Sequence, residues 1–312
     1  MIPNLKLTGQ AGLIVLLLIL FSLLDARFLA PDNLVNILLQ ISIIGIIACG
    51  MTFAVLTGGL DLSVGSVAAM SGVVFVLALD AGLWLAGAIA LAAGTLVGVV
   101  NGFLIGRCRL SSLIVTLGAM AWAQGVALWL SRGYPIAGPG DDFEMLGGGF
   151  FLHVPLPIVF FAVAVAASYY LLLHTQFGRD LYALGGNRDA AELAEIPMAH
   201  REWLVYVLCS ALASFSGLVL ASRLNTGSPI IGQDAALQAI VAVVLGGTSL
   251  YGGRGGILET AIGLITIGVL SNGLNLLKIP PAVRWGITGC ILMLFAGLDS
   301  RRRTPCGNQQ NV

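Results

Sequence analysis

Long apolar runs separated by short polar stretches dominate this chain. A helix that crosses the hydrocarbon core of a bilayer needs about 20 mostly apolar residues. The pattern predicts ten such helices, at residues 7–26, 34–56, 62–80, 83–106, 112–130, 156–173, 203–222, 235–250, 256–277 and 284–299. The third and eighth are short, as expected of helices that are broken within the membrane. We therefore predict an all-α polytopic membrane protein that forms one domain over residues 1–312.

Composition supports this fold class and argues against nucleic-acid binding and metal binding. The chain is 58% hydrophobic and only 10% charged, whereas a soluble domain carries about 25% charged residues. With a net charge of zero and no basic stripe, nucleic-acid binding is not expected. The five cysteines and three histidines are scattered, so no metal site is predicted. The first apolar run lacks a small-residue cleavage site and is read as a retained helix.

The basic residues predict the orientation, because Lys and Arg collect on the cytosolic side of membrane proteins. With both termini inside, ten of the fifteen basic residues fall on the inner side, including Arg301, Arg302 and Arg303. This topology makes 131–155 an outer, periplasmic loop and 174–202 an inner, cytosolic loop. It also makes spans two to five and spans seven to ten enter the membrane from opposite sides. Such a pair of blocks is typical of an inverted-repeat transporter.

A polar break interrupts the apolar pattern after the second span, in the stretch Leu56–Ser66. Polar groups at membrane depth are costly and need a reason. One interpretation is structural: glycines end span two, and the acid and hydroxyls satisfy the start of span three. The other is a role in the pathway, as a substrate contact or gate. Both concern the same residues, Gly58, Gly59, Asp61, Ser63 and Gly65.

Glycine recurs at every fourth residue along one face of the fourth span. Small residues at this spacing let helix backbones approach closely in lipid. We expect an internal packing face, with a subunit interface or the lining of a pathway as the alternatives. The residues concerned are Gly94, Gly98, Gly102 and Gly106.

The inner loop 174–202 holds eight of the thirty charged residues. From Asn187 to Ile196 it reads as a short helix outside the membrane, capped by Asn187 and ended by Pro197. It is either a self-contained capped helix or a segment that inserts into a cytosolic partner and transmits motion. The outer loop 131–155 is either a solvated connector or a docking surface. The residues assigned to coupling are Asn187, Arg188, Asp189, Ala190, Ala191, Glu192, Leu193 and Glu195.

Catalytic motifs are missing from the sequence. It has no Gly-x4-Gly-Lys-Ser/Thr loop, no HExxH pair and no Gly-x-Ser-x-Gly elbow, so we predict no catalytic residues, no bound cofactor and no ATPase site in this chain. The glycine-rich stretch Gly246–Gly256 lacks the lysine of a phosphate loop and is read as a flexible turn. A proton-coupled carrier would need several buried acids, and the spans offer only Asp61 and Glu259.

Four ordered blocks of sequence resemble the ribose-type permease subunits of bacterial sugar ABC importers, the inner-membrane components of binding-protein-dependent transport systems. The similarity extends over nearly the whole chain. The blocks are Gly50–Ser66, Leu181–Asn187, Ala242–Leu250 followed by Gly252-Gly253, and Leu270–Leu277.

The resemblance implies a permease subunit that imports a monosaccharide, a ribose-like pentose or a hexose, by alternating access. It implies about ten spans in the inner membrane, a homodimer, a cytosolic ABC ATPase subunit that binds ATP and Mg²⁺, and a periplasmic sugar-binding protein. It also makes Asn187–Ile196 the coupling helix. The alternative is a secondary, ion-coupled transporter of a small polar solute.

Overall fold

The computed structural model describes residues 4–301. Arg302 and Arg303, assigned above to the inner side, and the rest of the C-terminal segment lie outside the described residues. The regular secondary structure of the described residues consists of helices and two small antiparallel pairs, β1 (Ile136–Ala137) with β4 (Thr226–Gly227) and β2 (Phe150–Phe151) with β3 (Val154–Pro155). The predicted all-α class is confirmed.

Each predicted span contains one helix. These helices are α1 (Asn4–Leu24), α2 (Pro31–Leu56), α3 (Val64–Leu77), α4 (Leu83–Gly102, continued by a π-turn at Phe103–Arg107), α5 (Ser112–Ser131), α7 (Leu156–His174), α10 (Met198–Arg223), α11 (Ala235–Leu245), α12 (Ile257–Leu276) and α13 (Pro281–Arg301). Among the described residues, α2, α4, α5, α7, α10 and α12 are long and apolar enough to cross a membrane. Two 3₁₀ turns (Ala26–Leu29 and Leu79–Ala81) connect spans.

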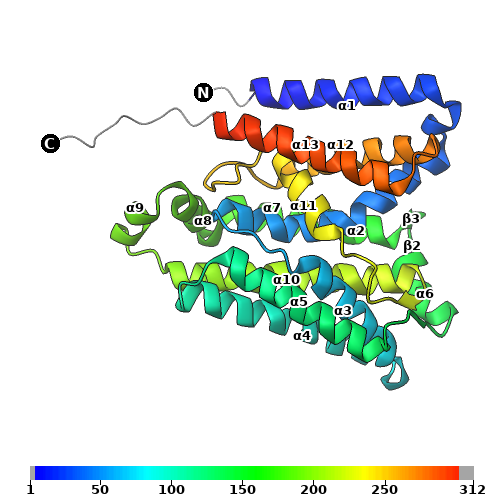
Figure 1. Cartoon of the computed structure of the whole chain (residues 1–312), viewed down its shortest axis with the longest axis horizontal. Coiled ribbons are helices and arrows are strands. Elements are labelled where there is room, and N and C mark those ends of the chain that lie inside the picture. The colour runs from blue at the N-terminus through cyan, green and yellow to red at the C-terminus, as the bar shows by residue number, and fades with distance from the viewer. Residues whose placement is uncertain (1–3, 302–312) are drawn as a thin grey trace.

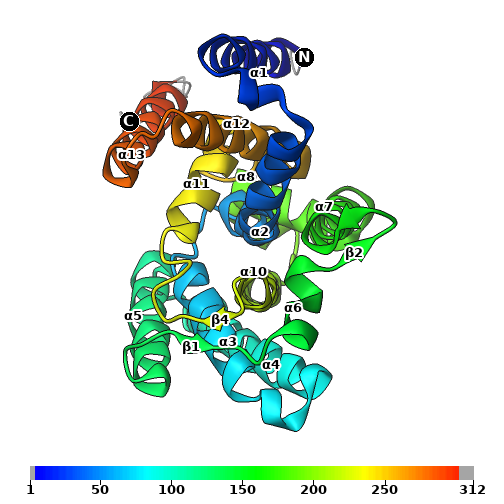
Figure 2. The same cartoon turned by 90° about the vertical axis from the view of Figure 1, so that its right-hand side faces the viewer.

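The long helices lie roughly along the longest axis of the molecule (Figure 1). Helix α10 is enclosed by α2, α3, α4 and α6 (Asp141–Gly148), whereas α1, α12 and α13 lie together at the far end of the cross-section (Figure 2). In Figure 1, α1 begins and α13 ends on the same side as α9 (Arg188–Leu193). This side is called the α9 side below.

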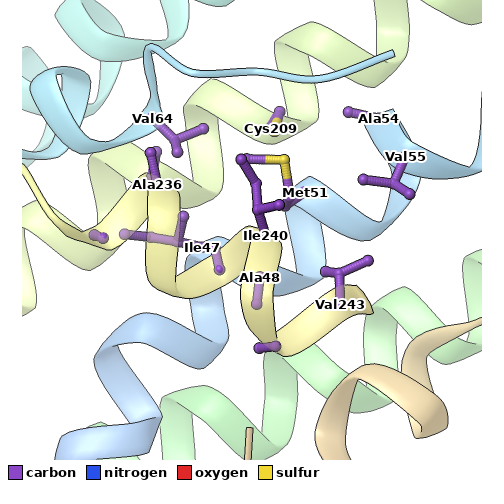
Figure 3. Packing of buried hydrophobic residues seen from close by; sticks show 14 of the residues in the cluster. Ile47, Ala48, Met51, Ala54, Val55, Val64, Cys209, Ala236, Ile240 and Val243 are labelled. Carbon is purple, nitrogen blue, oxygen red and sulfur yellow. The ribbon is translucent and has the colours of Figure 1, made fainter. Parts of the chain in front are cut away.

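The core forms where α2, α3, α10 and α11 meet. Figure 3 shows Met51, Cys209 and Ile240 at the centre of this cluster, with the side chains of four different elements in contact. Met51 and Cys209 are completely buried. Since lipid is as apolar as these side chains, close packing rather than escape from water holds such helices together.

The glycine face of α4 packs on α10. Added Cβ atoms on Gly94 and Gly98 would stand 2.5 Å and 2.7 Å from the Cβ atoms of Ser214 and Ser210. One on Gly102 would stand 2.6 Å from the carbonyl oxygen of Trp203, and one on Gly106 would overlap the carbonyl of Ala199. This face is therefore occupied within the chain.

Among the helices in the predicted spans, α3 and α11 are the short ones, as the pattern predicted, with 14 and 11 residues. Each begins after a non-helical stretch, and the first turn of α3 meets the stretch before α11: a Cβ on Gly65 would lie 2.7 Å from the carbonyl oxygen of Gly232. Gly232 has a φ of 95°, a left-handed backbone that glycine adopts without a steric penalty. Two broken helices thus face each other inside the bundle.

The structure corrects two expectations about the loops. The outer loop contains α6, and the inner loop contains α8 (Gln176–Gly186) in addition to α9. Pro197 does not end α9, which stops at Leu193, because Glu195 turns the chain with a φ of 55°. Helix α3 begins at Val64, within the predicted span 62–80.

Candidate functional site

Three glycine-rich segments meet on the α9 side of the molecule. They are the end of α2 (Leu56–Gly58), the end of α8 (Gly185–Gly186) and the turn between α11 and α12 (Gly252–Gly253), and together they are called the glycine junction. The N–H of Gly253 donates to the carbonyl oxygen of Leu56 at 2.9 Å. A Cβ on Gly185 would stand 2.6 Å from the nitrogen of Gly253. Backbone therefore contacts backbone, with no room for a side chain on Gly185.

The turn between α11 and α12 is consequently not the flexible connector predicted from its glycines. The N–H of Ser249 donates to the carbonyl of Arg254 at 2.9 Å, and Tyr182 of α8 donates its hydroxyl to the carbonyl of Gly255 at 2.7 Å. Burial and the nearby Glu259 carboxylate raise the pKa of Tyr182 above its ordinary value. The phenol therefore stays protonated and keeps donating. This turn is fixed to α8.

Helix α8 is also tied to α10. Arg201 Nε lies 2.7 Å from the carboxylate of Asp180, and both side chains are largely buried. A buried ion pair tolerates the loss of one partner poorly, because the other charge is left without compensation. The base from which α9 projects is therefore held on two sides, by the glycine junction and by α10.

Helix α9 itself presents most of its surface to solvent. Asn187 caps it as predicted, accepting the N–H of Ala190 at 3.0 Å. Ala191 is buried against the protein, whereas Leu193 is 87% exposed. Asp189, like Ala190, is also exposed. A short capped helix with an exposed leucine is suited to insertion into another protein.

Two ion pairs connect α9 to the neighbouring elements. Arg188 contacts Glu202 of α10 at 2.9 Å, and Glu192 lies 3.8 Å from Arg109. The side chain of Glu202 is only 6% exposed, and its Oε2 has no hydrogen-bond partner among the described residues. Arg188 thus neutralises a buried carboxylate.

Two cavities open beside these pairs, with volumes of about 410 Å³ and 320 Å³. Arg109, Arg188 and Glu202 line both. The first also reaches Gly58 and Gly59 of the polar break. The surface around α9 is therefore grooved and charged, and it is continuous with the end of α2.

The polar break serves the helix ends that flank it. Gly58 has a φ of 79°, and the N–H groups of Gly58 and Gly59 donate to the carbonyls of Val55 and Ala54, which satisfies the last turn of α2. Asp61 is completely buried and accepts from the N–H and hydroxyl of Ser63, at 3.0 Å and 2.5 Å.

The remaining polar groups of the break stay within the protein. Asn101 donates to the Ser63 hydroxyl at 3.2 Å. The second carboxylate oxygen of Asp61 has no hydrogen-bond partner among the described residues. Asp61 lines neither of the two cavities described above. The geometry therefore favours the structural interpretation of the break over direct contact with a solute.

Sequence reasoning missed several residues of this region: Asp180, Tyr182, Arg201, Glu202 and the packing role of Gly252-Gly253. The glycine doublets were a signal, since paired glycines far apart in sequence permit close backbone contact. The structure shows which doublets meet. Among the described residues, no group of three His, Cys, Asp or Glu side chains could hold a metal ion.

Comparison with known proteins identifies the class. The family described as "Branched-chain amino acid transport system / permease component" matches residues 33–296. The chain belongs to this family, and it is a multi-pass permease component of the inner membrane.

Individual relatives are similar over almost their full length. The ribose import permease protein of Bacillus subtilis is 40% identical over 306 residues, which cover 95% of this chain and 93% of the relative. That of Escherichia coli K12 is 38% identical over 305 residues, 95% of each chain. An L-arabinose ABC transporter permease protein of Azospirillum brasilense is 38% identical over 305 residues, 96% of this chain and 89% of the relative.

Proposed function

We propose that this chain is the permease subunit of an ATP-driven importer for a monosaccharide, most simply a ribose-like pentose, and that it forms the translocation pathway by alternating access. The observation that carries the proposal is the end-to-end similarity to ribose and arabinose permeases, at 38–40% identity over 95–96% of the chain. The family description names amino acids, so the substrate class needs a direct test.

The energy source is an ATPase subunit that docks on α9. The sequence has no phosphate-binding loop, so hydrolysis must occur in another chain. Burying a leucine contributes about 1.5–3 kcal/mol, and Leu193, at 87% exposure, is the bare apolar side chain of α9. Because α9 follows α8 and the end of α8 is part of the glycine junction, a partner bound to α9 can move the end of α2 and the turn between α11 and α12 together.

Orientation and assembly follow from this docking. In this proposal the α9 side faces the cytosol, together with the start of α1 and the end of α13, and the outer loop 131–155 faces the periplasm. A periplasmic sugar-binding protein docks on the face that holds α6, which is anchored to α10 by the Ser222 hydroxyl donating to the carbonyl of Phe143 at 2.5 Å. A second copy of the chain completes the pathway.

The test is uptake of labelled D-ribose and L-arabinose by cells that express the chain together with its ATPase and binding protein. Cells with the wild-type chain should take up a labelled pentose, and this uptake should require the ATPase. Uptake by the chain alone would instead support a secondary transporter. Uptake of leucine without pentose would overturn the sugar assignment.

Docking through α9 is tested with Leu193→Asp. A carboxylate in an apolar cleft should weaken docking by about 2–3 kcal/mol, a loss of roughly 30- to 150-fold in affinity. Leu193→Met is the matched control, because it keeps an exposed apolar side chain of similar volume at the same position. Equal uptake by the two variants would contradict the docking role of α9.

Arg188 is a less informative target. Removing it would leave the buried Glu202 carboxylate without its partner at 2.9 Å, so a loss of transport would mix damage to folding with damage to coupling. Asp189 is exposed and can be replaced by alanine without this effect. Substitutions of Leu193 and Asp189 therefore test coupling without the damage to folding that loss of Arg188 would cause.

A further inference from the structure

A cleft of about 470 Å³, lined by both polar and apolar side chains, lies between α2, α11, α12 and α13. It is in the half of the molecule opposite the α9 side: Gln40 belongs to the first half of α2, and Leu56 at the other end of that helix belongs to the glycine junction. The volume falls in the range of about 300–1,000 Å³ typical of small-molecule sites. Its lining includes Gln40, Asp234, Gln238, Arg284, Trp285 and Thr288.

The lining presents unused hydrogen-bonding capacity. Asp234 and Arg284 line the same cleft, yet they form no ion pair within 4.0 Å in the described structure. Arg284 Nε is buried without a partner among the described residues, and its Nη1 reaches only Asn275 Oδ1, at 3.5 Å. An ionised group left unsatisfied near membrane depth is costly, which marks this arginine as a residue that awaits a ligand.

The mixture of groups matches a neutral polyhydroxylated ligand. A carboxylate only accepts hydrogen bonds, a guanidinium only donates them, and a glutamine amide does both. Each hydroxyl of a sugar is both a donor and an acceptor, so Asp234, Arg284 and Gln238 can all be satisfied by one ring. The single negative and single positive charge balance, which disfavours a ligand of net charge.

Trp285 adds a surface for the apolar face of a sugar ring. Its indole is 59% exposed and lines the cleft beside Arg284. An aromatic ring supplies rigid contact area to C–H groups while the hydroxyls at the ring edge remain free for polar partners.

The cleft narrows toward the interior. It continues into a pocket of only about 40 Å³, which shares Gln40, Gln238 and Ser271 and adds Ile41 and Ile44. This volume is less than a tenth of that of the cleft, so a sugar does not fit at this point. A wide cleft with polar side chains that ends at an apolar constriction is the arrangement expected at the closed end of a pathway.

From these observations we infer that the cleft is a transit site for a monosaccharide, with Asp234, Arg284 and Gln238 contacting its hydroxyls and Trp285 its apolar face. The inference deepens the proposed function and rests on it for the class of solute. A zwitterionic amino acid is the competitor, because it too could contact Asp234 and Arg284. It would leave the amides without partners, which favours the sugar.

The experiment is a fluorescence titration of the purified full-length chain in detergent with D-ribose, L-arabinose and L-leucine. Because a transit site must also release its ligand, we expect saturation in the millimolar range. The response should be present in the wild type and absent in Trp285→Phe. Asp234→Asn should need about ten times more sugar, since hydrogen bonds to a charged group are lost.

Matched controls separate binding from folding. Trp84→Phe and Asp80→Asn change the same residue types outside the cleft, and their titrations should equal that of the wild type; the thermal midpoint should be unchanged in all variants. The inference is overturned if the wild type shows no saturable fluorescence response up to about 100 mM sugar. It is also overturned if Trp285→Phe and Asp234→Asn respond to sugar as the wild type does, or if leucine saturates the response in place of sugar. Pentose uptake by the assembled transporter is measured separately, so a transporter that moves pentose without this response overturns only the transit site.

Discussion

Replacing Gly185 with alanine is the sharpest test of the glycine junction. An added Cβ would overlap the carbonyl oxygen of Leu56 and stand 2.6 Å from the nitrogen of Gly253. Ordinary contacts begin at 3.4 Å, so the segments would have to separate by about 0.8 Å on the Gly253 side. The obstacles are backbone atoms, which cannot rotate away as a side chain could.

The energetic cost can be estimated from three contributions. Overpacking of this kind costs about 1–3 kcal/mol, and stretching the bond from Gly253 to Leu56, 2.9 Å long, costs about 1 kcal/mol. Alanine gains up to about 1 kcal/mol over glycine in a helix. Gly185→Ala should therefore destabilise the protein by about 2 kcal/mol.

The adjacent residue supplies the control. A Cβ on Gly186 would meet nothing within 4 Å, so Gly186→Ala should be neutral or stabilise by up to about 1 kcal/mol. The variants should then differ by about 3 kcal/mol, which corresponds to roughly 6–12 °C in the thermal midpoint. Unfolding in detergent, followed by the loss of the monodisperse peak on size exclusion, measures it. Midpoints within about 2 °C of each other would refute the contact.

Two further substitutions test how the bundle is held together. Gly98→Leu should reduce the amount of folded protein and lower its thermal midpoint in detergent, because its Cβ would stand 2.7 Å from Ser210 Cβ. Gly87→Ala on the same helix should be neutral, because the nearest atom to its Cβ is 3.7 Å away. An unchanged midpoint for Gly98→Leu would contradict the packing of α4 on α10. Arg201→Ala should destabilise the protein by about 3–5 kcal/mol, because the buried Asp180 carboxylate loses its partner. The double variant Arg201→Ala/Asp180→Ala, assayed by the same unfolding measurement, should recover part of this loss. A double variant as unstable as the single one would argue against the ion pair.

The sequence was sufficient to locate the spans. Apolar length alone placed a helix in each predicted range, and the short third and eighth spans correspond to α3 and α11. Helix α8 was missed because Arg179 and Asp180, together with its three glycines, make Gln176–Gly186 resemble a loop. Its amphipathic pattern extends over only 11 residues, too few for periodicity to outweigh composition.

The details of the candidate site were less predictable. Local rules identified Asn187 as the cap of α9, because a cap bonds to residues a few positions away. The end of α9 depends on a left-handed Glu195, a conformation that glutamate rarely adopts, so Pro197 was the more reasonable expectation. The partner of Arg188 is Glu202 on another helix, and the partners of Gly185 come from two distant segments. Such contacts depend on tertiary packing that no local pattern encodes.

The glycine junction has a mechanical consequence. Contacts between side chains can slip from one rotamer to another, which absorbs part of a displacement as conformational entropy. Glycine has no rotamers to exchange, so the contact between Gly185, Gly253 and Leu56 behaves as a stiff linkage. If a partner docks on α9 as proposed, a displacement of α9 would therefore reach the end of α2 and the start of α12 together and with little attenuation.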